Sequence, residues 1–172
     1  MGSSHPLRRG NEYDMIEIFE CVKTSFSVIG KEGIGNASNA IAWIGGLWKS
    51  TNENYLEIED LSKKDDQGRT LGFWGAMSDT KHTYGPWSDL GMYLAGVEVE
   101  DDRVAPQGWT KWTIPGYKYL YAKVTGDYAA VMDEVIHRYM PDKGYHLAGA
   151  IHEYYCPEEN GQLYLFFPIE RI

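Results

Sequence analysis

Apolar side chains recur along this chain with the period of a strand in some stretches and of a helix in others. Residues 15–31 alternate and are rich in β-branched and aromatic side chains, which predicts a strand region with a break near residues 23–25. Gly33 and Gly35 are expected to end it. The same strand pattern returns in two later stretches, residues 71–77 and 89–100.

A stretch whose apolar residues have helical spacing lies between the first strand region and the later ones. Asn36 or Ser38 is expected to cap this helix, and the apolar positions that follow lie three and four residues apart. Residues 51–69 are polar and acidic, which predicts a solvent-exposed loop. The order of the first half is therefore strand, helix, strand, strand. The apolar helical positions are Ala40, Ile41, Ile44, Leu47 and Trp48.

The second half repeats this order. Residues 117–124 predict a strand, and residues 128–139 predict a helix that begins after Asp127 and is stopped by Pro141. Two further strands are predicted to close the chain, at residues 145–155 and 162–169.

The repeated order predicts an α+β fold built from two tandem β-α-β-β units. The units cover about residues 15–105 and 109–172, related by a pseudo-twofold axis. Antiparallel sheets covered by helices on one side leave room for a ligand cleft between the repeats. We expect residues 11–172 to form a single domain and residues 1–10 to be part of a tag or disordered.

The stretch Gly108–Gly116 is predicted to be the crossover between the two units. It contains Trp109 and Trp112, whose side chains have opposite parity if the stretch is extended. Only one of the two indoles can then face the cleft, and we favour Trp112.

Composition narrows the class of ligand. Aromatic residues make up 14% of the chain, more than a core of this size needs, which indicates a lined cavity. The net charge is -9 and the basic residues form no large cluster, so nucleic acid is not expected as a direct partner. The negative balance favours cationic or neutral small molecules.

Cysteine and histidine residues do not indicate a metal site or a disulfide framework. Cys21 and Cys156 are far apart, and the five histidines lack metal-ligand spacing. No cofactor motif is present. No apolar run approaches the length of a membrane span, and no signal peptide is recognised, so we expect a cytoplasmic protein without a membrane partner.

Glu153 is the strongest candidate for chemistry. Residues 149–155 alternate, which places Glu153 on one face with Ile151 and Tyr155, and His152 on the other. A carboxylate between apolar and aromatic neighbours is desolvated, and desolvation raises its pKa. It could serve as the counter-charge of a cationic ligand or as a general base that activates water. The alternative is an ordinary glutamate at a strand edge that points to solvent.

Aromatic residues outside the helices are candidates for the walls of the cleft. Trp43 and Trp48 fit a helical pattern and are expected in the core. The candidates for ligand contact lie in or beside strands and glycine-rich connections. Four tryptophans share this setting, Trp74, Trp87, Trp109 and Trp112. Of these we assign Trp74, Trp109 and Trp112 to the site, together with the hydroxyl-bearing Tyr93 and Tyr155.

Five segments of the chain resemble the GyrI-like family, the effector-binding domain also found in AraC-type and multidrug-responsive MerR-type regulators. In order they are Phe26–Lys31, Tyr93–Val99, Trp112–Tyr119, His152–Tyr155 and Phe167–Ile169. The resemblance implies the tandem fold with a ligand cleft between the repeats. It also places Glu153 at the position of a family carboxylate that lies among aromatic side chains in the cleft. The chain has no helix-turn-helix segment, which argues against direct transcription control.

The leading hypothesis is a stand-alone protein that binds a hydrophobic, aromatic or cationic small molecule, with Glu153 as polar anchor. Relatives of this family imply an alternative, hydrolysis of a cyclopropane-type genotoxin, with Glu153 activating water and Tyr155 assisting. They also imply a further alternative, a protein that acts by contacting a gyrase. The sequence does not predict the oligomeric state.

Overall fold

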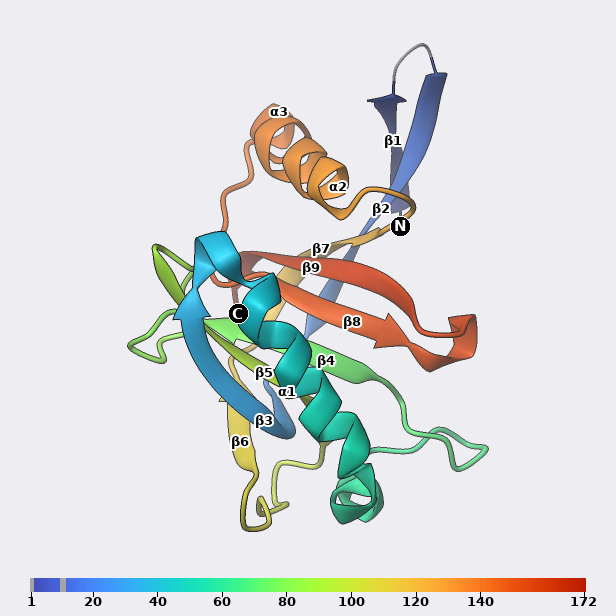
Figure 1. Ribbon diagram of the computed structural model, residues 1–172. Coiled ribbons are helices and arrows are strands. Elements are labelled where there is room, and N and C mark those ends of the chain that lie inside the picture. Colours follow the sequence, from blue (N-terminus) through green and yellow to red (C-terminus); the bar gives the residue numbers. More distant parts are fainter. Residues whose placement is uncertain (1, 10–11) are drawn as a thin grey trace.

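The computed structural model describes residues 2–9 and 12–172, with side chains from residue 16 onward. Within these ranges, nine strands form one antiparallel sheet in the order β1-β2-β7-β9-β8-β4-β5-β3-β6 (Figure 1). The strands are β1 Gly2–Arg9, β2 Glu12–Lys23, β3 Phe26–Asn36, β4 Phe73–Ser78, β5 Leu90–Val99, β6 Thr110–Ile114, β7 Tyr117–Lys123, β8 His152–Cys156 and β9 Gln162–Arg171.

The helices lie on one face of this sheet. In Figure 1, α1 crosses the half that contains β3, β4 and β5, and α2 lies over the other half. The longer elements are α1 Ile41–Glu53, α2 Tyr128–Glu134, the π-helical segment Val135–Tyr139 and α3 Met140–Lys143. Short 3-10 turns are η1 Ala37–Asn39, η2 Tyr55–Glu57, η3 Glu59–Leu61 and η5 Pro157–Glu159.

The expected α+β class with tandem repeats is confirmed, and the sheet order shows how the repeats join. β3, β5 and β4 form one half, β7, β9 and β8 the other, and the halves meet where β4 pairs with β8. β2 leads into β3 but pairs with β7, whereas β6 leads into β7 but pairs with β3. Each repeat therefore gives its opening strand to the other half. The stretch Gly108–Gly116 is thus largely a strand, β6, rather than only a connection.

Three apolar clusters hold the elements together. α2 and the π-helical segment bury Val131 and Val135 against the β2, β7 and β9 strands, with Leu165 and Phe167 below them. A second cluster around Ile58 and Val97 packs η2 and η3 onto the sheet. Each fully buried side chain of this size contributes roughly 1.5–3 kcal/mol. The third cluster lies on the opposite face of the sheet and contains Phe26, Val28, Trp74, Leu94 and Trp112.

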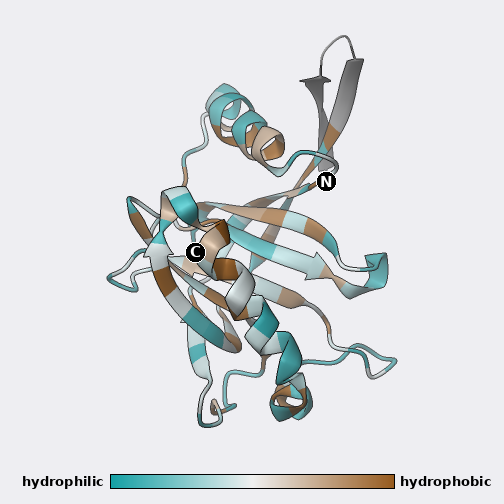
Figure 2. Cartoon of the chain, in the orientation of Figure 1, coloured by the Kyte–Doolittle hydropathy of each residue, from teal (hydrophilic) through white to brown (hydrophobic). Residues whose placement is uncertain are grey.

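Helix α1 lies on the sheet but buries few of its own side chains. Thr51 is its one buried residue, and Ile41 is 93% exposed. Trp43 and Trp48 are half-buried, so the prediction that they belong to the core is wrong. The apolar first turns of α1 are brown in Figure 2. This apolar stripe faces a cavity rather than a packed core.

Two glycines that were expected to end the first strand region lie inside it instead. β3 continues through Gly33 and Gly35 to Asn36. A Cβ at Gly33 would lie 2.9 Å from a Leu47 methyl carbon, and one at Gly35 would lie 2.3 Å from the Trp43 Nε1. The glycines therefore let α1 side chains lie directly on the strand.

Other element boundaries also differ from the predictions. No side chain caps α1, which starts at Ile41 after a 3-10 turn, and the expected loop at 51–69 begins with the end of α1 and two more such turns. Pro141 does not stop the second helix, which runs on through the π-helical segment into α3 and contains Pro141 at the start of α3. The helix ends at Gly144, which has a φ of 73°. Residues 145–151 form no strand, and β8 starts only at His152.

The expected tag falls partly outside the described residues. Residues 1 and 10–11 are not described, and for Gly2–Arg9 the backbone alone is described, as β1 paired with β2. Whether this segment is a tag stays a prediction.

Candidate functional site

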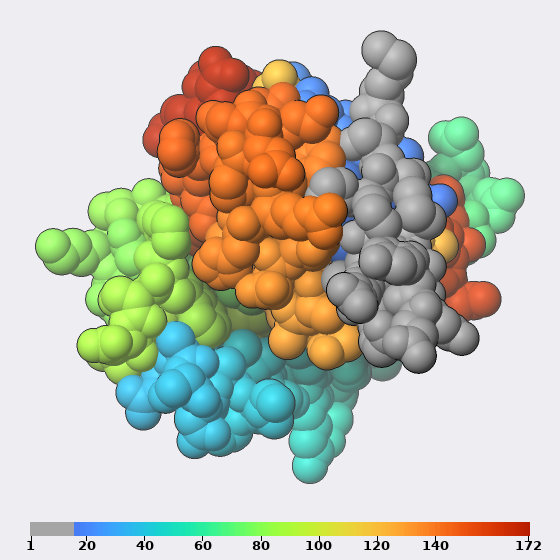
Figure 3. Space-filling view, turned by 90° about the horizontal axis from the view of Figure 1, so that it is seen from above, coloured from blue at the N-terminus to red at the C-terminus, as the bar shows by residue number. Residues whose placement is uncertain are grey.

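A cavity of about 840 Å³ lies between α1 and α2, above the seam where the two halves of the sheet meet. Figure 3 looks onto this side, with the cyan start of α1 and the orange α2 on either side of the opening. The loop between β4 and β5 contributes Trp87. No lysine, arginine or histidine is among the described residues that line it. Its apolar lining includes Ile41, Ile44, Trp48, Met132, Leu147 and Ile151.

The pairing of β4 with β8 places Glu153 at the floor of this cavity. Gly75 lies opposite Glu153 and Phe73 opposite Tyr155, so the two strands present these residues to the helical face together. A Cβ at Gly75 would lie 2.0 Å from the Tyr93 hydroxyl and 2.8 Å from Glu153 Oε1. A glycine is therefore required at this position for the tyrosine to reach the carboxylate.

Two tyrosines hold the Glu153 carboxylate. The Tyr93 hydroxyl donates to Oε1 at 2.5 Å, and the Tyr128 hydroxyl donates to Oε2 at 2.7 Å. Trp48 Nε1 in turn donates to the Tyr93 oxygen at 2.8 Å. These contacts join α1, β5, β8 and α2 around one acidic group that is 9% exposed. The glutamate is therefore not the solvent-exposed strand-edge residue that was the alternative.

Burial raises the pKa of Glu153 above its ordinary value, and the hydrogen bonds from Tyr93 and Tyr128 oppose part of this rise. The pKa values of both tyrosines are raised as well, first by burial and then by the charge of Glu153. Their hydroxyls consequently remain protonated donors at neutral pH. The site is a negatively charged group held by neutral donors, without a cation among the described residues around it.

His152 is adjacent to Glu153 in the sequence but lies on the other face of β8, as predicted. Its Nδ1 accepts a hydrogen bond from the Met77 N–H at 3.1 Å. Burial lowers the pKa of His152 to about 3, so the imidazole is neutral and supplies no counter-charge.

Three of the six predicted ligand-contacting residues gather at this site. Glu153 and Tyr155 line the cavity, and Tyr93 lies beneath Glu153. Trp74, Trp109 and Trp112 are not among the lining residues, because each indole is held elsewhere.

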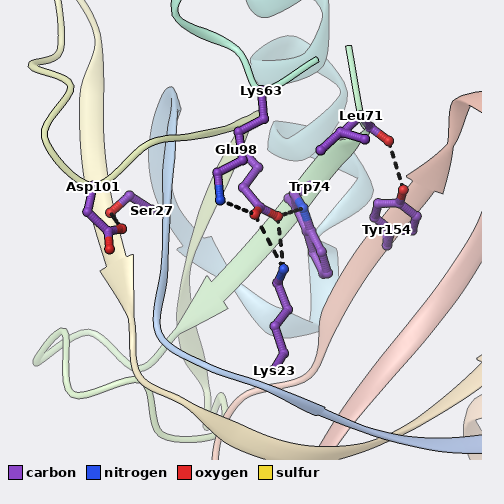
Figure 4. A network of polar contacts seen from close by, with 8 residues as sticks. All are labelled: Lys23, Ser27, Lys63, Leu71, Trp74, Glu98, Asp101 and Tyr154. Carbon is purple, nitrogen blue, oxygen red and sulfur yellow. Dashed lines mark hydrogen bonds and ion pairs between the residues drawn. The ribbon is translucent and has the colours of Figure 1, made fainter. Parts of the chain in front are cut away.

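Trp74 and Trp112 lie on the face of the sheet opposite the helices. Trp74 Nε1 donates to Glu98 Oε1 at 3.1 Å, beside the ion pairs that Glu98 makes with Lys23 and Lys63 (Figure 4). Trp112 pairs with Val28 across the strands, and its Nε1 donates to a Glu32 oxygen. Trp112, which was expected to face the cleft, therefore points away from the cavity.

Trp109 has the parity of the helical face, but the turns after α1 cover it. It packs in the cluster with Ile29 and Ile58, and its Nε1 donates to Glu57 Oε1 at 3.0 Å. Lys31 Nζ lies 4.0 Å from its ring centroid. Its π-face is thus already occupied by a cation of the chain.

Two other tryptophans do belong to the site: Trp48, which was expected in the core, and Trp87, which was considered as a wall but not chosen as a site residue. Trp87 stacks on Trp43 with ring centroids 5.7 Å apart. Gly91 lies under Trp87 as Gly35 lies under Trp43, and these two glycines pair directly between β3 and β5. Glycines inside a strand pattern are a signal that a bulky group approaches the backbone, and that signal could have located this aromatic pair.

The family becomes clear when this geometry is set beside known proteins. The model of the Cass2 family, the integron-associated effector binding proteins, matches residues 22–169. The chain belongs to this family. The expected resemblance to GyrI-like effector-binding domains is thereby confirmed, and the Cass2 family is one of effector-binding, small-molecule-binding domains. No curated protein matches this Cass2 chain significantly.

Solved structures with the same fold share little sequence with this Cass2 protein. The structure of SAV2435 bound to tetraphenylphosphonium is 19% identical, with a TM-score of 0.63 over 89% of this chain and 93% of that one. The integron cassette protein VCH_CASS2 from the mobile metagenome of Vibrio cholerae is 16% identical, with a TM-score of 0.54 over 89% and 95%. The EcmrR C-terminal domain is 15% identical, with a TM-score of 0.57 over 91% and 99%.

The described residues of the Cass2 chain contain neither a metal-binding cluster nor a membrane-spanning helix. Among the described residues, no group of three His, Cys, Asp or Glu side chains is arranged to hold a metal ion. None of the helices in the described ranges is both long and apolar enough to cross a bilayer.

Proposed function

We propose that this protein binds a bulky aromatic or apolar cation in the cavity between α1 and α2, with Glu153 as the counter-charge. One observation carries the proposal: a buried carboxylate at the floor of a largely apolar cavity whose described lining contains no basic side chain. A cation that enters the cavity supplies the missing positive charge. The bound tetraphenylphosphonium of SAV2435, which has the same fold, is a ligand of this chemical class.

A lipophilic cation suits this site better than a small, strongly hydrated one. Removing a strongly hydrated ion from water carries a large desolvation penalty, whereas a charge spread over aromatic groups loses less hydration. Trp48, Trp87 and Tyr155 offer aromatic surfaces, and cation–π contacts at desolvated sites contribute about 2 kcal/mol. The cavity lies within the roughly 300–1,000 Å³ range of small-molecule sites.

The tyrosine contacts favour binding over hydrolysis. Both oxygens of Glu153 already accept hydrogen bonds from Tyr93 and Tyr128. These bonds stabilise the ionised form and oppose part of the rise in pKa that burial causes. A general base also needs a lone pair directed at a water molecule, and the tyrosines already occupy one lone pair on each oxygen. Mass spectrometry of recovered ligand checks this point, and we expect the ligand to be unchanged after prolonged incubation.

Calorimetric titration with tetraphenylphosphonium tests the proposal directly. We expect the wild-type protein to bind it and Glu153→Gln to bind at least about tenfold more weakly, because the substitution removes the counter-charge and keeps the shape. Glu57→Gln is the matched control, since it removes the same charge at an exposed residue outside the cavity and should leave affinity unchanged.

Tetraphenylborate provides a second control, because it has nearly the same shape and the opposite charge. The wild-type protein should reject this anion, and Glu153→Gln should accept it better than the wild type does. Equal affinity of the wild type for the two ions, or full affinity of Glu153→Gln for the phosphonium, would contradict the role of Glu153.

A further inference from the structure

A second, smaller cavity adjoins the first and shares two of its walls. It has a volume of about 310 Å³ and is lined by Trp48, Asn52, Phe73 and Tyr155. Trp48 and Tyr155 also line the larger cavity, so the two spaces lie on either side of this aromatic pair. No charged side chain is among the described residues that line the smaller space.

The aromatic partition between the cavities is held in a defined geometry. The Trp48 ring meets Tyr155 edge-on, with centroids 5.4 Å apart and planes at 80°, and it meets Phe73 at 6.3 Å and 67°. The hydrogen bond from Trp48 Nε1 to Tyr93 fixes the indole from below. The ring faces that remain are surfaces on which a flat aromatic group can stack.

Charge is distributed unequally between the two spaces. Glu153 lines the larger cavity and is not part of the lining of the smaller one, where Asn52 is the polar residue and is exposed at the rim. A cationic group is therefore favoured in the larger cavity. A neutral aromatic group with its outer edge toward an amide and solvent suits the smaller cavity.

We infer that the site takes an elongated ligand in two parts: a bulky cationic part beside Glu153, and a neutral aromatic arm that passes Tyr155 and stacks in the smaller cavity on the ring faces that Trp48 and Phe73 leave open. This inference rests on the proposed function and adds the shape of its ligand. The arm contributes affinity in addition to the charge.

Triphenylphosphonium cations that differ in one substituent test the inference by calorimetry. One probe carries a methyl group, and the others carry a phenyl group on alkyl linkers of increasing length. We expect the best phenyl arm to bind the wild-type protein about tenfold more tightly than the methyl compound. Saturated alkyl arms of equal carbon number should gain less, because they cannot stack.

Asn52→Trp is the decisive variant, because an indole at this exposed position fills the smaller cavity and leaves the larger one open. The gain from the phenyl arm should vanish while the affinity for the methyl compound stays unchanged. Gly46→Trp is the matched control. It adds the same indole to α1 at an exposed position where a Cβ meets no atom within 4 Å and which lines neither cavity.

A second variant, Phe73→Leu, removes the stacking surface without filling the space and should reduce the gain from the arm alone. The inference is overturned if the wild-type protein shows no gain, or if the gain persists in Asn52→Trp. Failure of the proposed function looks different. In that case the methyl compound does not bind, or it binds the wild type and Glu153→Gln equally.

Discussion

Glu153 is a buried acid whose hydrogen-bond partners are neutral. Glu153 is 9% exposed, and its partners are the neutral hydroxyls of Tyr93 and Tyr128. By contrast Glu98, equally buried on the other face of the sheet, pairs with Lys23 and Lys63. The protein thus pairs Glu98 with basic side chains and holds Glu153 with neutral hydroxyls.

The unpaired charge should lower the stability of the free protein. Burial raises the folded-state pKa of Glu153 above 4.5, so the folded state binds its proton more tightly than the unfolded state does. The resulting stability is fully present below pH 4.5 and is lost as the pH rises through the raised pKa. We expect Glu153→Gln to melt at least about 2 °C higher than the wild type at neutral pH.

Thermal melts followed by circular dichroism across the acidic range check this prediction. The advantage of Glu153→Gln over the wild type should shrink on acidification, since both side chains are then neutral. A difference in melting temperature that is independent of pH would show that the charge is not the cause.

At the residue scale, the sequence predicted the acid but not most of its aromatic walls. Alternation along β8 was sufficient to place Glu153 with Tyr155 and opposite His152. Parity could not say which face of β4 and β6 the helices cover, so Trp74 and Trp112 were assigned to the wrong side. Trp48 was expected in the core because an apolar helical stripe has the same pattern whether it faces a core or a cavity.

At the scale of elements, α1 and α2 differ in how they are held. α2 buries Val131 and continues into the π-helical segment, which buries Val135 against the sheet. By contrast, α1 is anchored to β5 by Thr51, whose hydroxyl donates to the Ala95 carbonyl at 2.7 Å. The upper part of α1 lies on the glycine pair Gly35 and Gly91 through the Trp43–Trp87 stack. These contacts fix one wall of the cavity.

Gly91→Ala should therefore weaken ligand binding from a position outside the cavity lining. Its Cβ would lie 2.1 Å from Trp87 Cδ2, so the indole has to leave its place and lose its hydrogen bond to the Met92 carbonyl. We expect about a tenfold loss of affinity for tetraphenylphosphonium by calorimetry. Gly46→Ala, where a Cβ meets nothing within 4 Å, is the control. Unchanged binding by Gly91→Ala would contradict the role of the stack.

The sequence predicted elements better than it predicted their ends. The strand–helix–strand–strand order of both halves followed from hydrophobic period, and Asp127 does cap α2 by accepting from the Ala129 N–H. Gly35 and Pro141 were taken as terminators from local preference alone. In the structure, Gly35 lies under Trp43 within β3, and Pro141 directly follows the π-helical segment within a continuing helix. Such tertiary effects are not visible in a local pattern.

At the scale of the whole molecule, strand exchange makes the halves depend on each other. β2 completes the half that contains β7, and β6 completes the half that contains β3. All tryptophans of the chain lie between residues 43 and 112, in the first half and in β6. Their fluorescence therefore reports mainly on that half of the sheet, and on the seam through the contacts of Trp48 with Tyr155 and of Trp74 with Tyr154.

A core substitution in the other half should be detected by those tryptophans. Leu165→Ala removes a fully buried side chain of β9 and should lower the free energy of unfolding by about 2–5 kcal/mol. We expect urea unfolding to give the same loss by tryptophan fluorescence as by far-ultraviolet circular dichroism, in one transition. If Leu165→Ala keeps the wild-type midpoint by fluorescence but has a lower midpoint by circular dichroism, the two halves unfold separately.

The seam between β4 and β8 also determines how many acids lie at the floor of the cavity. A symmetric pair of identical half-chains could close the same kind of sheet, but every acid near its axis would then occur twice. In the single chain, Glu153 on β8 faces Gly75 on β4. The single chain therefore places one carboxylate, not a symmetric pair, at the floor of the cavity. The second acid of the lining, Asp127, lies at the start of α2, where its side chain accepts from the Ala129 N–H.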